Sequence, residues 1–246
     1  MNELAYGATD VGRRREGNED SYLLLPEKDI YMVADGMGGH NAGEVASQNA
    51  VKMVAEYFTI ERMAKMKEDQ QQVKKEMVKA IEEAHQKIRK LSKTVKEYAG
   101  MGSTIVLSFI HHQLLHTCHA GDSRVYVINQ SGISQITNDH STVAELVQMG
   151  KMTKEEARHS PMKNQITQAL GSSFSLEPEY NQHSLNKGDK VLLCSDGLWE
   201  MLSDEEIQAI VMEEGSVDET CRKLIDQANQ AGGNDNITVV LVEYRG

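Results

Sequence analysis

Residues 104–137 read TIVLSFIHHQLLHTCHAGDSRVYVINQSGISQIT, and this run sets the architecture of the chain. It divides into four short segments that are rich in β-branched residues and are separated by turn residues: 104–110, 114–120, 124–128 and 133–137. Short strands joined by tight turns are typical of an antiparallel meander. We therefore predict antiparallel sheet in the middle of the chain.

Helical patterns lie on both sides of this run. Upstream, a helix is predicted at 42–58, and apolar residues then recur every three or four positions over 73–95, as in a long amphipathic helix. That stripe could also form a coiled-coil seam, but its length of about three heptads favours packing on a sheet. Downstream, capping-box patterns at Ser203 and Ser216 start two more helices. Because the order of elements is not βαβ, the chain is predicted to be α+β, with antiparallel sheets flanked by helices.

Length and composition are those of one globular domain. The chain has 246 residues, of which 39 % are hydrophobic, with three prolines and no linker-like run of Pro, Gly or Ser. This length is typical of one or two domains. Since no break in composition divides the chain, we predict a single domain over residues 1–246.

Charge and cysteine content exclude several classes of protein. With 26 Lys and Arg against 37 Asp and Glu, the net charge is −11, and no basic cluster suits nucleic acid, so we expect no nucleic-acid partner. No apolar run approaches the roughly 18 residues that span a bilayer. The first residues do not resemble a secretory signal, so we expect a cytoplasmic protein with no membrane partner. Scattered Cys118, Cys194 and Cys221 exclude a disulfide scaffold and a thiolate zinc site.

Four aspartates share a context. Asp35, Asp122, Asp196 and Asp235 each lie at or beside the end of an apolar strand, with glycine close by. Any one of them could be an ordinary turn residue. Four carboxylates gathered at strand ends repel one another unless cations neutralise them, and oxygen ligands without cysteine favour Mg²⁺ or Mn²⁺. The sequence therefore predicts a metal centre, in which the carbonyl of Gly36 could also be a ligand because glycine lets the backbone approach closely.

Six short motifs follow one another between residues 6 and 244. They are REGNED (15–20), DGMGGH (35–40), GST (102–104), AGDSR (120–124), SDGLW (195–199) and DNITV (235–239). In this order they resemble the metal-dependent type 2C protein serine/threonine phosphatases, in their short bacterial form. The resemblance implies a sandwich of two antiparallel β-sheets flanked by pairs of α-helices, with a small flap insertion.

The resemblance also implies two metal ions. Asp35 would bridge the two Mn²⁺ or Mg²⁺ ions, the carbonyl of Gly36 would bind the second, and Asp196 and Asp235 would complete the first. Water activated at this binuclear centre would hydrolyse phosphoserine and phosphothreonine without a phosphoenzyme. The partners it implies are phosphorylated proteins, among them a bacterial Ser/Thr kinase that the enzyme opposes, and family members are usually monomers.

The remaining implied roles lie around that centre. Glu19 and Asp20 would hold metal-bound water, Asp122 would share a third, weaker ion with Asp196, and Arg15 would bind the substrate phosphate. A planar guanidinium suits a phosphate dianion better than an ammonium does.

Several residues keep two interpretations. His40 is either a general acid for the leaving alkoxide or a loop residue, because Met37 stands where many eukaryotic members carry histidine. Asn18 and Asn236 either orient ligands or form turns. The tract His111, His112, His116 and His119 is interpreted as structural.

Residues 138–171 resemble the flap subdomain of the family, which lies beside the metal site and helps to select substrate. A simple connecting loop is the alternative, but about 30 residues is long for one. Two other functions also remain open. One is a catalytically silent, phosphatase-like scaffold, and the other is a metal-dependent phosphodiesterase.

Overall fold

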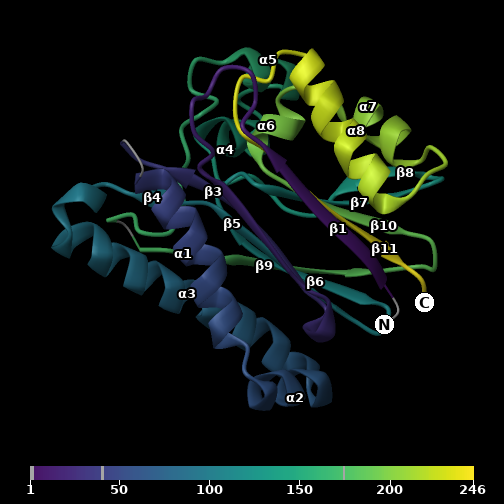
Figure 1. Ribbon diagram of the computed structural model, residues 1–246, viewed down its shortest axis with the longest axis horizontal. Helices are drawn as coiled ribbons and strands as arrows, with labels where there is room; N and C mark the ends of the chain where they lie inside the picture. Colours follow the sequence, from purple (N-terminus) through teal and green to yellow (C-terminus); the bar gives the residue numbers. More distant parts are fainter. Residues whose placement is uncertain (1–2, 40–41, 174) are drawn as a thin grey trace.

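Two antiparallel sheets stack face to face in this computed structural model, which describes residues 3–39, 42–173 and 175–246 (Figure 1). The first sheet has the strand order β1 (Glu3–Asp10), β11 (Ile237–Tyr244), β10 (Lys190–Cys194), β7 (Arg124–Asn129) and β8 (Gly132–Gln135). The second has the order β2 (Asp20–Leu25), β3 (Ile30–Met37), β5 (Ile105–His111), β6 (Leu114–Ala120) and β9 (Glu179–Ser184), and β4 (Gly102–Ser103) pairs with β3.

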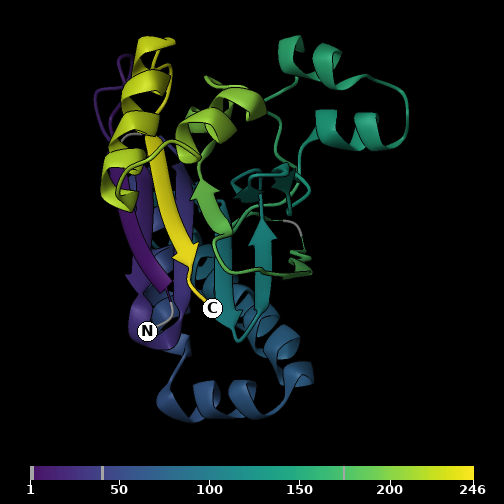
Figure 2. The same ribbon diagram turned by 90° about the vertical axis from the view of Figure 1, so that its right-hand side faces the viewer.

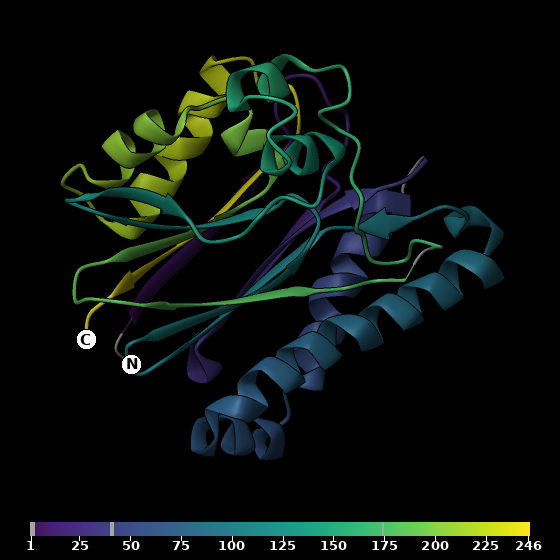
Figure 3. The same cartoon turned by 180° about the vertical axis from the view of Figure 1, so that it is seen from behind.

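Helices cover both outer faces of the sandwich (Figures 1 and 3). The face of the second sheet carries α1 (Ala42–Tyr57), α2 (Ile60–Glu68) and α3 (Gln70–Thr94), followed by the 3₁₀ turn η2 (Lys96–Tyr98). The face of the first sheet carries α6 (Asp196–Trp199), α7 (Asp204–Val211) and α8 (Val217–Gln230). The short 3₁₀ turn η1 (Pro26–Lys28) connects β2 and β3. The predicted α+β sandwich with helices on both sides is confirmed.

Strand alternation explains how three apolar layers form. Along β3, Ile30 and Met32 pack under α1 and α3, whereas Tyr31 and Val33 face the other sheet. Successive strand side chains point to opposite faces, so a strand buried on both faces must be apolar throughout. The stripe on α3 packs into the same helix-side core through residues such as Met77 and Ile81, and so is not a coiled-coil seam.

The run 104–137 is not one continuous meander, because it changes sheet in its middle. Strands β5 and β6 belong to the second sheet, whereas β7 and β8 belong to the first. The chain crosses between them at Gly121, whose φ of +110° is a conformation that L side chains rarely adopt. A Cβ there would also lie 2.6 Å from the side chain of Thr104. This crossing leaves Asp122 between the two sheets, at the end of β6.

Two elements differ from the sequence-based expectation. Strand β9 was not anticipated, because its sequence EYNQHS is polar and it pairs only with β6, at the edge of its sheet. Helix α2 is separate from α3, since Asp69 caps the start of α3 by accepting a hydrogen bond from the Gln71 backbone. Neither feature leaves a strong periodic signal.

Residues 138–171 project to one side of the sandwich and contain α4 (Thr142–Gln148) and α5 (Lys154–His159) (Figure 2). Isolated β-bridges close this segment at its base, joining Ser141 to Ile166 and Ser103 to Leu170. In the described part of the chain, no helix has the length and apolar character needed to cross a membrane.

Candidate metal centre

Five aspartates reach the same end of the sandwich from different elements. Asp20 begins β2 and pairs in register with Asp35 near the end of β3. Asp122 lies in the crossing after β6, Asp196 begins α6 directly after β10, and Asp235 precedes β11. Their charges act on one another: the negative charges of Asp20, Asp196, Asp122 and Asp235 all raise the pKa of Asp35. The structure therefore brings together carboxylates that are up to 215 positions apart in the chain.

These carboxyl groups are poorly solvated. Loss of water, and then the charge of neighbouring aspartates, raises the pKa of Asp35 and Asp196 well above the usual range, although water still reaches part of each residue. Burial raises the pKa of Asp20 and of Asp122 to about 7. Such shifts mean that ionised carboxylates are disfavoured here unless a cation offsets their charge.

Several carboxylate oxygens in this cluster also lack hydrogen-bond donors. Among the described residues, Oδ1 of Asp20, Asp122 and Asp196 is buried without a partner. A buried acceptor left without a donor costs free energy, so such atoms call for an explanation such as a bound ion. Oxygen donors of this kind suit Mg²⁺ and Mn²⁺. The cluster therefore fits divalent cations, and the individual ligand assignments stay predictions.

Asp35 is held by the GST motif. Its backbone N–H donates to Thr104 Oγ1 at 2.9 Å, and its carbonyl accepts from the Thr104 backbone at 2.8 Å and from Ser103 Oγ at 3.1 Å. The sequence contains the motif but does not indicate that it bonds to Asp35. These hydrogen bonds are long-range, because they link the end of β3 to the turn between β4 and β5.

Two further supports come from SDGLW. Ser195 Oγ donates to Asp20 Oδ2 at 2.7 Å, and Trp199 Nε1 donates to the carbonyl of Asp122 at 3.1 Å. The sequence analysis assigned neither residue a role of its own. Their place at the two ends of the SDGLW motif is the one sequence feature that could have indicated these supporting roles.

Gly36 has a packing reason to be glycine. A Cβ at this position would lie 2.1 Å from the carbonyl oxygen of Gly43 in α1 and 2.6 Å from that of Glu19. Its backbone N–H also donates to the Glu19 carbonyl at 3.1 Å. The close approach of these three backbone segments requires glycine whether or not the Gly36 carbonyl binds metal, so that role stays a prediction.

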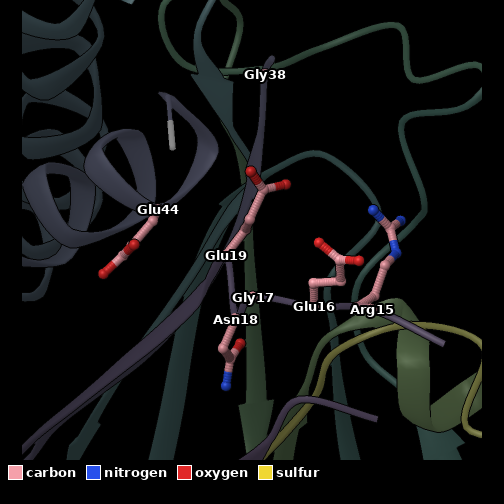
Figure 4. A pocket seen from close by; sticks show the side chains of 7 residues that line it. All are labelled: Arg15, Glu16, Gly17, Asn18, Glu19, Gly38 and Glu44. Carbon is pink, nitrogen blue, oxygen red and sulfur yellow. The ribbon is translucent and has the colours of Figure 1, made fainter. Parts of the chain in front are cut away.

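Arg15 is one of the residues that line a hollow of about 360 Å³. Its lining also includes Glu16, Glu19 and Glu44 (Figure 4). Arg15 Nη2 donates to Asp235 Oδ2 at 2.6 Å, and its side chain is 49 % exposed. The phosphate-binding candidate is thus tied to one of the predicted metal ligands and still reachable from solvent.

Glu19, Asn18 and His40 were also predicted to lie at the site, and the structure places the first two differently. Burial raises the pKa of Glu19, which lines the hollow. Asn18 points away from the hollow (Figure 4), donating to Thr9 Oγ1 at 2.8 Å and accepting from the Asp20 backbone at 3.1 Å. Its side chain therefore joins this loop to Thr9 in β1 and bonds to the backbone two positions further on. His40 lies outside the described residues, so its two interpretations stay as they were.

A separate group of potential ligands lies at the base of the flap. Each of His119, His140 and Glu179 offers a potential ligand atom, and these atoms all lie within 4.8 Å of one another. Within residues 3–39, 42–173 and 175–246, no other group of three or more His, Cys, Asp or Glu residues is as close together. The aspartates are thus spread more widely than this trio.

The geometry of the trio does not suit a single ion. The two imidazole rings stack with centroids 4.5 Å apart and planes 19° apart, so their in-plane lone pairs do not converge. The Gly121 N–H donates to His140 Nδ1 at 3.3 Å, which leaves the ring proton on Nε2, facing Glu179 Oε2 at 3.6 Å. We interpret the trio as an anchor for the flap, because His119 Nε2 bonds to the Asn138 carbonyl and Asn138 Nδ2 donates to Glu179 Oε1, each at 2.7 Å.

Comparison with known proteins gives consistent matches over almost the whole chain. A sequence profile of the family described as protein phosphatase 2C matches residues 12–241. Protein phosphatase PhpP of Streptococcus pneumoniae is 39 % identical over 238 residues, which cover 95 % of this chain and 94 % of that protein.

Solved structures agree with this match. A serine/threonine phosphatase of S. agalactiae superposes with a TM-score of 0.90 at 35 % identity, covering 99 % of this chain and 100 % of that one. The catalytic domain of the phosphatase PstP, solved in complex with two manganese ions, superposes with a TM-score of 0.84 at 31 % identity, covering 99 % of each chain.

Proposed function

Since the chain belongs to the protein phosphatase 2C family and is a metal-dependent serine/threonine protein phosphatase, we propose that its aspartate cluster holds two Mn²⁺ or Mg²⁺ ions and that Arg15 binds the substrate phosphate. The observation that carries this proposal is the set of buried, partnerless oxygens on Asp20, Asp122 and Asp196 around Asp35. Hydrogen bonds within the described chain leave these atoms unsatisfied, and divalent cations would satisfy them.

The proposed ligands divide between the two ions. Asp35 would bridge them, the Gly36 carbonyl would bind one, and Asp196 with Asp235 would bind the other. When bound, such a pair supplies an activated water and offsets negative charge on the phosphoryl group. The PstP complex with two manganese ions supports a pair rather than a single ion.

Arg15 would receive the phosphate at the mouth of the hollow. Its guanidinium can donate two parallel hydrogen bonds to phosphate oxygens, and the bond to Asp235 fixes its position beside the cluster. Glu16, Glu19 and Glu44 line the same hollow and would repel a dianion elsewhere on its wall. The phosphate group is therefore directed to the side that carries Arg15.

Finer features of the proposal rest on the family resemblance. Glu19 and Asp20 would hold water near the ions, and Asp122 with Asp196 would bind a third, weaker ion. Substrates would be phosphorylated proteins, among them a bacterial Ser/Thr kinase, with the enzyme acting as a cytoplasmic monomer. Residues 138–171 would act as the substrate-selecting flap of a single domain.

One assay series separates this proposal from a silent scaffold and from a phosphodiesterase. Phosphoserine and phosphothreonine peptides, a phosphotyrosine peptide and a DNA oligomer are each incubated with Mn²⁺ or with EDTA. We expect phosphate release from the first two only, and only with Mn²⁺. Full turnover in excess EDTA would overturn the metal assignment, and cleavage of the oligomer would favour the phosphodiesterase.

A further inference from the structure

One buried side-chain amide, that of Asn236, bonds to the loop that carries Arg15 at three points. We propose that Asn236 is a positioning residue for phosphate binding: it fixes residues 11–19, here called the phosphate loop, so that Arg15 faces the hollow. This inference rests on the phosphate-binding role proposed above for Arg15. Asn236 itself does not touch the substrate in this proposal.

The contacts of Asn236 reach both halves of the phosphate loop. Its Nδ2 donates to the carbonyls of Val11 and Gly17, each at 2.9 Å. Its Oδ1 accepts from the backbone N–H of Glu19 at 2.8 Å. The residue is only 4 % exposed, so one enclosed amide uses both donors and its acceptor on the two sides of Arg15.

These contacts distinguish the two interpretations that the sequence left open for Asn236. A turn-forming asparagine bonds to backbone within a few positions. The side chain of Asn236 instead reaches residues 217 to 225 positions away. Its task is therefore to join the end of the chain to the phosphate loop.

A second set of contacts docks the start of the loop on the same segment. The backbone N–H of Arg13 donates to the Gly233 carbonyl at 2.7 Å. Asp10 Oδ1 accepts from the Gly12 N–H at 2.8 Å and from Asn229 Nδ2 at 2.9 Å. Residues 229–236 thus shape the phosphate loop. Within that segment, Asn236 bonds to the part of the loop that follows Arg15, at Gly17 and Glu19.

Loss of the amide should affect the phosphate loop more than the metal ligands. Without it, the carbonyls of Val11 and Gly17 lose their donor, and the loop must rearrange to reach water. Asp235 keeps its bond, because Oδ1 accepts from the backbone N–H of Asn236 at 2.8 Å and not from the side chain. Glu19 also stays attached, since its carbonyl accepts from Gly36 at 3.1 Å.

The test is a double-mutant cycle on KM and on inhibition by inorganic phosphate. Asn236→Ala should raise KM for a phosphothreonine peptide, and Ki for orthophosphate, about tenfold, while kcat stays within about twofold of wild type. If Asn236 acts through Arg15, adding Asn236→Ala to Arg15→Ala should raise neither value further. Mn²⁺ stoichiometry, measured by calorimetry without substrate, should not change.

Asn49→Ala is the matched control. Its half-buried amide donates to the Val45 carbonyl at 2.7 Å, a bond within α1 that does not involve the phosphate loop, so KM and Ki should stay at the wild-type values. If Asn236→Ala does not fold, as judged by circular dichroism, Asn236→Ser gives the same comparison with a smaller polar group.

The outcomes distinguish the positioning role of Asn236 from the phosphate-binding role of Arg15. If Arg15→Ala raises KM and Ki but Asn236→Ala does not, the positioning role is wrong and the proposed function stands. If Arg15→Ala changes neither, the phosphate-binding role of Arg15 is itself wrong. Independent, additive effects, or a loss of bound Mn²⁺ in Asn236→Ala, would also overturn the positioning role.

Discussion

Asp122→Asn should make the metal-free protein more stable. Asp122 is 3 % exposed, and its Oδ1 has no hydrogen-bond partner among the described residues. Burial, and then the negative charge of Asp139, raises the pKa of Asp122 to about 7. Asparagine has nearly the same shape without the charge, so the substitution relieves an unfavourable ionisation and leaves no cavity.

The magnitude follows from the difference between the folded and unfolded pKa. The usual aspartate value is 3.8, so the folded state holds the Asp122 proton more tightly and loses stability as pH rises from about 4 to about 7. About three pKa units at about 1.4 kcal/mol each correspond to about 4 kcal/mol at pH 8. At pH 4 the same difference is less than about 1 kcal/mol.

Urea unfolding in EDTA measures this difference directly. Wild type, Asp122→Asn and the exposed control Asp226→Asn are compared at pH 8 and pH 4, and the control should change the free energy of unfolding by less than about 0.5 kcal/mol. In excess Mn²⁺ the advantage of Asp122→Asn should shrink, because only wild type would gain the binding energy of the proposed third ion. A variant less stable than wild type at pH 8, or an advantage that does not change with pH, would refute the reasoning.

Three further predictions follow from other parts of the structure. Asp35→Asn should lower kcat by at least about 100-fold in a phosphopeptide assay with Mn²⁺, and a near-wild-type rate would contradict its proposed bridging role. Arg124→Ala should lower the free energy of unfolding, measured in urea, by about 3–5 kcal/mol, because the largely buried carboxylate of Asp139 loses its hydrogen bonds of 2.6–3.2 Å to the guanidinium. A loss below about 1 kcal/mol would show that this ion pair is unimportant for stability. Burial lowers the pKa of His116 to about 4, below the usual 6.5, so its contribution to stability is complete above pH 6.5 and is lost as pH falls towards 4, by about 3 kcal/mol in all. His116→Gln should remove that part of the acid sensitivity in unfolding curves recorded between pH 7.5 and pH 4.5, and an unchanged profile would contradict the assignment.

The layers of the fold were predictable because burial leaves a local pattern. The run IYMVA over residues 30–34 is apolar on both faces of β3, and the structure buries both. The change of sheet at Gly121 was not predictable, because residues on either side of it have similar strand patterns. Strand β9 was missed for a related reason: an edge strand with one paired side needs little apolar sequence.

The candidate site divides in the same way. The grouping of the aspartates was predictable, because the sequence shows carboxylates at the ends of strands and shows the motifs in their order. The donor from Trp199 to the Asp122 carbonyl, the bond between Arg15 and Asp235, and the amide of Asn236 were not, because each joins segments that are distant along the chain. Such contacts depend on tertiary packing, which local pattern and propensity do not encode.

The position of β11 has a consequence for the order in which the protein is made. This strand lies between β1 and β10 and pairs with both, yet it begins only at Ile237. At about 5–20 residues per second, β1 leaves the ribosome roughly 10–50 s before its partner has been synthesised. Throughout that interval the strand between β1 and β10 is missing from the first sheet, and Asp235 is missing from the cluster. With Asp235 as the metal ligand proposed above, a nascent chain cannot act on phosphoproteins before this point, and β1 and β10 stay without their shared partner until β11 has been synthesised.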